Sequence, residues 1–273
     1  MKIRIVDAFT DRPFAGNPAA VVLLDSGPFP GDDRLQRLAA EVNLSETAYA
    51  HPLPDGAEAD WALRWFTPAT EVNLCGHATL ATAHVLHTTG TATGAVRFAT
   101  RSGVLVAETA EDGSVTLDFP TAPLTETTPG DEVRAALGAE VVSAYDTGEN
   151  VGDLLVELTD EQTVRTLAPD LAAVARLPHR GVIVTARAAG ADAAYDYVSR
   201  FFGPAVGIDE DPVTGSAHTA LAPLWSARLG RETLTGLQAS ARTGLVRTTL
   251  RGDRTLLTGN AVTVIDGELL TGP

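Results

Sequence analysis

Two alanine-rich stretches have residue types suited to ligand chemistry, because each places a glycine beside polar side chains. Residues 73–86 read NLCGHATLATAHVL, and residues 211–225 read DPVTGSAHTALAPLW. Their apolar spacing predicts a buried helix in each stretch. The first turn of a helix leaves backbone N–H groups without intrahelical acceptors, and a glycine there allows close approach. We therefore expect these turns to bind a carboxylate or a developing enolate. The expected substrate-binding positions are Gly76, Ala78, Gly215 and Ala217.

Glu46 is the candidate acid–base residue, because it breaks the likeness between the two halves of the chain described below. It lies in a strand-like run, and the corresponding position of the second half is Val182, in an apolar strand. A carboxylate in a site closed from water has a raised pKa, which suits it to accept and return a proton near neutral pH. The alternative is a surface carboxylate at the start of a strand, the commonest fate of a glutamate.

Four further polar residues are candidates for the same site. His77 is either an acid–base and hydrogen-bonding partner or a satisfied histidine at a helix start, and Ser216 supplies a hydroxyl at the matching position. Asp211 either contacts a substrate amine or hydroxyl or only caps a turn. Asn17, after Gly16, either supports the floor of the site or only makes its turn. We predict Glu46, His77, Asp211 and Ser216 as catalytic and Asn17 as substrate-binding.

The remaining signals argue against a bound metal or cofactor. His77, His84 and His87 do not share one helical face and have no carboxylate nearby in the sequence, which is poor for zinc. The sequence has no glycine-rich nucleotide motif, and its one lysine, Lys2, lies in the first predicted strand, which disfavours Schiff-base chemistry. Cys75 is the one cysteine, so an internal disulfide framework and two-thiol racemase chemistry are excluded. Cys75 is either a small buried hydrophobe or, less commonly, a nucleophile.

These residues need a scaffold of strands around the two helices. The pattern predicts an α+β fold of two pseudo-symmetric halves, each a mostly antiparallel curled sheet around a central apolar helix, with the active site in the interdomain cleft. Strands are expected at 3–9, 19–24, 60–66, 104–107, 115–119, 154–158, 181–185, 195–202, 246–250, 254–258 and 261–265, and residues 43–49 are expected to leave a helix and enter a further strand. Further helices are expected at 32–41, 132–137 and 167–175, and the second central helix at 216–228. The Thr/Pro-rich residues 120–129 are expected to cross between the halves.

An internal repeat supports the two halves. Residues 60–68 (DWALRWFTP) match residues 196–204 (DYVSRFFGP), and residues 101–104 (RSGV) match residues 242–245 (RTGL). The glycines that begin the two central helices match at nearly the same separation along the chain. Three matches in the same order indicate a duplicated structural unit.

The composition excludes several classes of protein. The chain has 273 residues and a formal net charge of −15, whereas nucleic-acid binding needs a basic surface. No apolar run approaches membrane-spanning length, and the first residues meet an acidic side chain too early for a secretory signal. We expect a cytoplasmic protein that binds a small molecule and neither nucleic acid nor membrane.

The sequence resembles the PhzF-type phenazine-biosynthesis proteins, which share the diaminopimelate-epimerase-like fold. The motifs FAGNPAAVV, NLSETAY, NLCGHATLA and DPVTGSAHTAL carry this resemblance, in this order. It implies a first half at 1–120, a second half at 121–263, a final strand (264–273) that returns to the first half, and a homodimer. It also implies a cofactor-free isomerase in which Glu46 moves a proton between carbons of a cyclohexadiene amino acid. In the family, the residues matching His77, Asp211 and Ser216 hold the substrate and assist.

The chain departs from the epimerase branch of this fold, which uses two thiols. Cys75 precedes the glycine of its motif and Ser216 follows the second glycine, so amino-acid epimerisation is disfavoured. We therefore expect an isomerase of a small unsaturated cyclic amino or carboxylic acid that acts in secondary metabolism. Two alternatives stay open: a family member that binds a small molecule without turnover, and thiol chemistry at Cys75.

Overall fold

The computed structural model describes residues 1–190 and 193–270. The chain forms two compact units. Unit 1 comprises Met1–Asp118 with Thr258–Pro273, and unit 2 comprises Phe119–Leu257. Both contain helices and strands, as an α+β fold requires, and the two units are described separately below.

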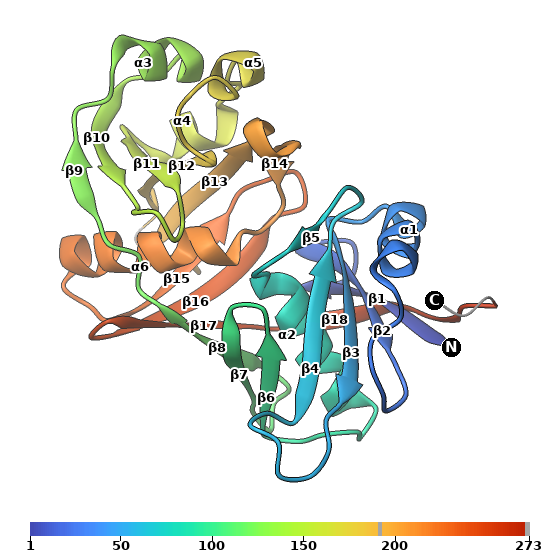
Figure 1. Cartoon of the computed structure of the whole chain (residues 1–273). Coiled ribbons are helices and arrows are strands. Elements are labelled where there is room, and N and C mark those ends of the chain that lie inside the picture. The colour runs from blue at the N-terminus through green and yellow to red at the C-terminus, as the bar shows by residue number, and fades with distance from the viewer. Residues whose placement is uncertain (191–192, 271–273) are drawn as a thin grey trace. The chain divides into compact units, whose positions relative to one another are not determined.

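Unit 1 is built from strands that surround one long helix (Figure 1). Its elements are β1 (Lys2–Ala8), β2 (Asn17–Leu23), α1 (Asp32–Val42), β3 (Glu46–Pro52), β4 (Trp61–Phe66), β5 (Glu71–Val72), α2 (Gly76–Thr88), β6 (Ala95–Thr100), β7 (Gly103–Thr109), β8 (Val115–Pro120), whose last two residues belong to unit 2, and β18 (Ala261–Glu268).

Unit 2 repeats this order of elements with short additions. Its elements are β9 (Thr125–Thr127), α3 (Asp131–Leu137), β10 (Val141–Asp146), β11 (Asp153–Leu158), α4 (Glu161–Thr166), α5 (Leu171–Val174), β12 (Gly181–Arg187), β13 (Tyr197–Gly203), the 3₁₀ turn η1 (Pro204–Val206), β14 (Ile208–Asp211), α6 (Gly215–Leu229), β15 (Thr233–Gln238), β16 (Gly244–Arg251) and β17 (Arg254–Gly259), which ends in unit 1.

Strand pairing follows the same pattern in both units, which confirms the pseudo-symmetry predicted from the sequence. In unit 1, β1–β2, β3–β4, β4–β5 and β6–β7 are antiparallel, and β2–β3 and β4–β6 are parallel. In unit 2, β10–β11, β12–β13, β13–β14 and β15–β16 are antiparallel, and β11–β12 and β13–β15 are parallel. Most pairs are antiparallel, as expected for this fold class.

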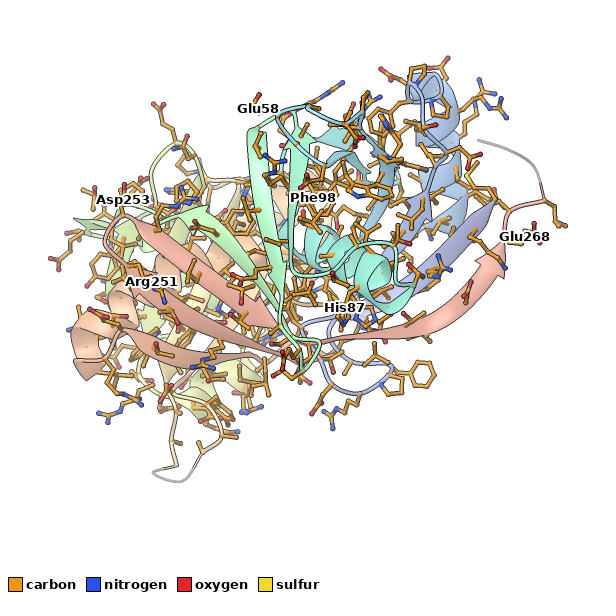
Figure 2. All side chains as sticks on the ribbon, turned by 90° about the horizontal axis from the view of Figure 1, so that it is seen from below. Glu58, His87, Phe98, Arg251, Asp253 and Glu268 are labelled. Carbon is orange, nitrogen blue, oxygen red and sulfur yellow. The ribbon has the colours of Figure 1, made fainter. Side chains whose placement is uncertain are left out.

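The helix α2 is the centre of unit 1. It contacts β1, β2, β3, β7 and β18, and its apolar side chains are distributed around the helix rather than along one stripe. Such a helix is stable only inside a protein, because no face of it is suited to water. Figure 2 shows His87 in its last turn and Phe98 on β6, where the Phe98 ring is fully buried. In unit 2, α6 has the same character and packs on β15 and β16.

The repeated residues Arg64 and Arg200 hold matching positions in their units. Arg64 donates to both carboxylate oxygens of Glu71, at 2.7 and 2.6 Å. Arg200 does the same with Glu210, at 2.7 and 2.9 Å. Each guanidinium also lies over a phenylalanine ring. Arg64 lies over Phe66, and Arg200 lies over the equivalent Phe202. The sequence repeat therefore marks a structural ion pair that ties neighbouring strands together.

One predicted helix is wrong in its bounds. The spacing predicted a helix over residues 167–175, but α4 ends at Thr166 and α5 covers only Leu171–Val174. Pro169 lies between them and disfavours helical backbone at the preceding residue. Asp170 then accepts a hydrogen bond from the Ala173 N–H at 3.0 Å and so begins a new short helix.

Six of the strands in the described part of the chain were not predicted: β5, β6, β9, β10, β14 and β15. In β15, Gly236 interrupts the apolar pattern. A Cβ atom at Gly236 would lie 2.4 Å from the ring of Tyr197, so only glycine fits beside that ring. Gly236, which the sequence pattern indicates as a turn residue, is therefore needed inside a strand because a larger side chain would not fit there.

The strand β18 pairs with β1 in antiparallel register, from Lys2 opposite Glu268 to Ala8 opposite Ala261. The far end of the described chain therefore lies in the sheet of unit 1, beside the first strand. Residues 271–273, part of the predicted returning segment, lie outside the described residues.

Leu80 in α2 offers a test of this packing. Its side chain is fully buried, so Leu80→Ala should leave a cavity and lower the free energy of unfolding by about 2–5 kcal/mol. Leu74, which is 42% exposed just before the same helix, is the matched control. Leu74→Ala should cost less than about 1 kcal/mol in denaturant unfolding. Equal losses for the two variants would contradict the central position of α2.

Candidate active site

Three polar side chains meet at the start of α2 in unit 1. Glu46 is the first residue of β3, Cys75 is the N-cap of α2, and His77 is the second residue of that helix. Glu46 Oε2 lies 3.1 Å from His77 Nε2, and Cys75 Sγ lies 3.6 Å from His77 Nδ1. All three residues are buried. The structure thus brings together Glu46 and His77, which are distant in the sequence.

The contacts within this cluster favour a protonated His77. Burial lowers the pKa of His77, but the electrostatic and hydrogen-bond contacts with Cys75 and Glu46 outweigh burial, so the pKa lies well above its ordinary value. Burial, together with the charge of Glu46, raises the pKa of Cys75. The thiol therefore stays protonated near neutral pH, and the Glu46 carboxylate is the group that stabilises the imidazolium. A protonated buried thiol is a poor nucleophile, which disfavours thiol chemistry at Cys75.

Glu46, Cys75 and His77 also resemble a set of metal ligands in composition. One candidate atom from each lies within 4.8 Å of the other two. However, Cys75 faces Nδ1 of the imidazole and Glu46 faces Nε2, on the other edge of the ring. One ring nitrogen cannot share an ion with both partners in this arrangement, so the geometry favours a hydrogen-bonded chain over a metal site.

The other histidines of α2 lie apart from this cluster. His84 Nε2 lies 3.2 Å from the Thr263 hydroxyl on β18, and burial lowers the pKa of His84. His87 lies in the last turn. Among the described residues, His77 groups with Glu46 and Cys75 rather than with His84 and His87.

The first turns of α2 and α6 have the features expected of ligand-binding helix starts. Neither N-cap, Cys75 nor Thr214, accepts a side-chain hydrogen bond from its helix. In α2, the Thr79 N–H donates to the Cys75 carbonyl at 3.3 Å, and the three N–H groups before it precede the helical ladder. The predicted substrate-binding positions within these turns are Gly76, Ala78, Gly215 and Ala217. Gly76 is half-buried and the other three are buried.

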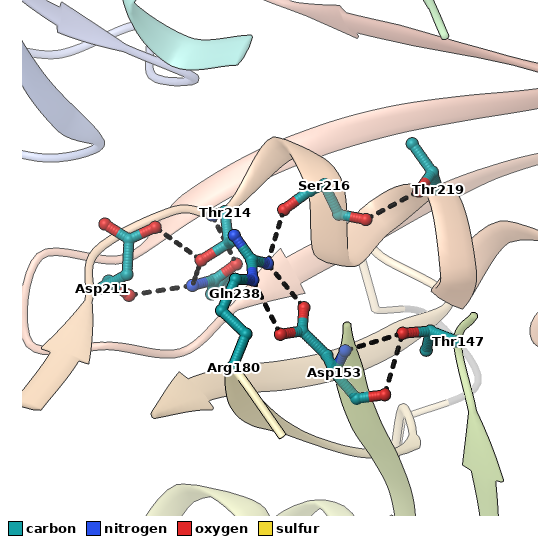
Figure 3. Close-up of polar contacts among 8 residues, drawn as sticks. All are labelled: Thr147, Asp153, Arg180, Asp211, Thr214, Ser216, Thr219 and Gln238. Carbon is teal, nitrogen blue, oxygen red and sulfur yellow. Dashed lines mark hydrogen bonds and ion pairs between the residues drawn. The ribbon is translucent and has the colours of Figure 1, made fainter. Parts of the chain in front are cut away.

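In unit 2, Ser216 is held by an arginine and a buried carboxylate (Figure 3). Arg180 donates from Nε and Nη2 to the two carboxylate oxygens of Asp153, at 2.9 and 2.6 Å. Its Nη2 also donates to Ser216 Oγ at 2.9 Å. A guanidinium can only donate, so the serine oxygen is the acceptor in this contact. The Ser216 proton is therefore directed away from Arg180 and is free to serve a ligand.

Asp211 belongs to a second polar group of unit 2 (Figure 3). The Thr214 hydroxyl donates to Asp211 Oδ2 at 2.5 Å. The buried Gln238 accepts from the Thr214 N–H at 2.9 Å and donates to the Asp211 carbonyl at 2.8 Å. Gln238 thus holds the backbone on both sides of Pro212. Asp211 stabilises the same loop, because its carboxylate accepts the hydrogen bond from the Thr214 hydroxyl.

Sequence reasoning missed the residues that support the predicted site in unit 2. These are Asp153, Arg180, Thr214 and Gln238. A signal existed for two of them: Asp153 begins an apolar strand, and Arg180 directly precedes the strand that corresponds to the Glu46 strand. Asn17, predicted to bind substrate, is fully buried with its amide Nδ2 3.3 Å from His77 Nδ1.

A family model described as phenazine biosynthesis-like protein, PhzC-PhzF, matches residues 6–267. The chain belongs to the PhzF family. An uncharacterized isomerase of Pseudomonas aeruginosa is 48% identical over 97% of this chain and 96% of its own length. A second uncharacterized isomerase, from Halalkalibacterium halodurans, is 44% identical over 98% of both chains. A crystal structure of a PhzF-family phenazine biosynthesis protein from Enterococcus faecalis has a TM-score of 0.90 and 40% identity, over 99% of both chains.

These matches confirm the family and the fold inferred from the four sequence motifs, and the relatives' names agree with the predicted isomerase class. They leave the substrate open. Across the described residues, no helix combines the length and apolar character needed to cross a lipid bilayer.

Arg180 allows a test of the buried ion pair. Arg180→Leu leaves the fully buried Asp153 without its counter-charge, and should lower the free energy of unfolding by about 3 kcal/mol. Adding Asp153→Asn removes the uncompensated charge and should restore part of the loss. Denaturant unfolding of both variants measures this, and a double variant no more stable than the single one would contradict a cost set by charge.

His218 gives unit 2 a predicted sensitivity to acid. It is fully buried in α6, its Nδ1 lies 2.9 Å from the Tyr197 hydroxyl, and burial lowers its pKa to about 3. The unfolded chain takes up this proton near pH 6.5, so the folded state loses stability as the pH falls from there toward 3. The loss from this one proton approaches about 1.4 kcal/mol per pH unit.

Unfolding free energies measured from pH 7.5 down to pH 4 test this prediction. In His218→Gln, the free energy of unfolding should fall less steeply with decreasing pH, because the uptake of one proton on unfolding is lost. Above pH 7 the profiles of the two proteins should be parallel. The same acid slope in both proteins would assign the effect to other groups.

Proposed function

We propose that this PhzF-family isomerase moves a proton between carbons of a small unsaturated cyclic amino or carboxylic acid, without a cofactor. The observation that supports this most directly is the buried contact of 3.1 Å between Glu46 and His77. A carboxylate held beside a cationic imidazole, away from bulk water, is ready to act as a base and has a hydrogen-bond donor next to it.

In the proposed reaction, the Glu46 carboxylate removes a proton from an activated carbon of the substrate. The C–H electron pair is delocalised over the unsaturated system and its carboxyl group, as in an enolate. The protonated Glu46 then returns the proton to another carbon of the same system. Atoms and electrons balance within the substrate, so no oxidant or reductant is needed.

The predicted partners stabilise the charge that develops in this reaction. His77 donates from Nε2 to the Glu46 carboxylate, which orients that carboxylate before the transfer. The uncapped first turns of α2 and α6 supply backbone N–H donors for an anion. Ser216 has a proton to donate, because Arg180 occupies its oxygen. The guanidinium of Arg180 adds positive charge beside Ser216 and favours a substrate with a carboxylate. Asp211 is proposed to contact a substrate amine or hydroxyl.

Glu46→Gln tests the proposal. The amide is nearly isosteric but cannot accept the proton, so kcat should fall by about 10²–10⁴-fold. Unsaturated cyclic amino acids are the substrates to assay, including the cyclohexadiene amino acids that the family resemblance implies. In heavy water, NMR should show solvent deuterium entering the substrate or product, unless the transfer is fully internal. Glu46→Asp, which keeps a carboxylate but shortens it, is the matched control and should retain more turnover. Full turnover in Glu46→Gln would overturn the mechanism.

The same assays separate an enzyme from a binding protein of the same family. A protein that only binds would retain its ligand affinity in Glu46→Gln and form no product from any bound compound. The homodimer, the cytoplasmic location, a role in secondary metabolism and the shared interdomain site remain predictions from the sequence.

A further inference from the structure

We propose that Asn17 is a positioning residue that occupies Nδ1 of His77, so that the imidazole keeps a proton on Nε2, facing Glu46. This inference deepens the proposed function, since it assigns the residue that prepares His77 for its role. The sequence suggested only that Asn17 makes a turn or lines the site.

The geometry around the His77 ring supports this assignment. Asn17 is the first residue of β2, and its fully buried amide Nδ2 lies 3.3 Å from Nδ1. The Cys75 thiol lies 3.6 Å from the same nitrogen. Nε2 lies 3.1 Å from Glu46 and has no hydrogen-bond partner besides this ion-pair contact among the described residues. Two groups thus share Nδ1, and the carboxylate alone faces Nε2.

These contacts determine which nitrogen carries the proton when His77 is neutral. An ionised carboxylate can only accept a hydrogen bond, so Nε2 must be protonated to be stabilised by Glu46. An amide N–H₂ group can only donate, so Nδ1 must then be the acceptor. When His77 is charged, the Asn17 amide can turn its oxygen toward Nδ1, since the two ends of the amide have nearly the same shape. Asn17 therefore accommodates both charge states while Nε2 remains a donor.

Unit 2 has a corresponding arrangement, which supports the inference independently. Its strand β11 matches β2, and the first residue of β11 is the fully buried Asp153. Asp153 binds Arg180, and Arg180 donates a hydrogen bond to Ser216. Ser216 is the second residue of α6, and His77 is the second residue of α2. In each unit, a buried polar residue at the start of the same strand orients the functional side chain at the start of the central helix.

Nitrogen-15 NMR of histidine-labelled protein tests the proposal without a substrate. His77→Gln identifies the His77 signals among those of the six histidines. In the wild type, neutral His77 should carry its proton on Nε2. Asn17→Asp places a carboxylate at Nδ1 and should keep Nδ1 protonated to a pH at least one unit higher than in the wild type. Asn17→Ala removes the donor and should move the Nδ1 resonance toward that of a nitrogen without a hydrogen bond.

Thr47→Val is the matched control, because Thr47 is fully buried beside Glu46 and its hydroxyl has no hydrogen-bond partner among the described residues. It should leave the His77 signals in place. A neutral wild-type His77 protonated on Nδ1, or an Asn17→Asp variant with unchanged Nδ1 protonation, would overturn the proposal. If the Asp variant does not fold, the Nδ1 shift in Asn17→Ala decides. Because no turnover is measured, this result is independent of the Glu46→Gln assay: His77 can be oriented by Asn17 even if Glu46 proves dispensable.

Discussion

A polar group buried in a protein must find its hydrogen-bond partner within the fold, and this requirement shapes both helix starts. The apolar character of α2 and α6 makes each helix central to its unit, so the polar residues of their first turns are carried inside as well. There, His77 contacts Glu46, Cys75 and Asn17, and Ser216 contacts Arg180. Side chains so constrained have few available orientations, which is the preorganisation that acid–base chemistry needs.

The two units keep the same frame and differ in their functional residues. The frame includes the bidentate pairs Arg64–Glu71 and Arg200–Glu210, which hold equivalent strands. At the helix starts the chemistry diverges: one unit has a histidine supported by an amide, and the other has a serine supported by an ion pair. The two units thus share the groups that fix the backbone, whereas the residues at the two helix starts differ between them.

Sequence patterns predicted the parts of this protein that depend on local periodicity and on the repeat. These patterns predicted the central helices and most strands, and they selected Glu46 and His77 as candidate site residues. The residues that hold Ser216 were not predicted, because Asp153 and Arg180 are separated along the chain and come together only through the parallel pairing of β11 and β12. The strand that contains Gly236 was not predicted, because this glycine is needed for packing against the Tyr197 ring, and no local sequence pattern reveals that contact.

The pairing of β1 with β18 has a consequence for biosynthesis. The strand β1 has one neighbour, β2, nearby in sequence, but its other neighbour, β18, is synthesised only after all of unit 2. Until then that edge of the nascent sheet exposes unpaired backbone, a surface open to aggregation or to chaperones. Unit 2 is contiguous in sequence and can be synthesised in full before β18, so unit 1 is the later of the two units to receive all its strands.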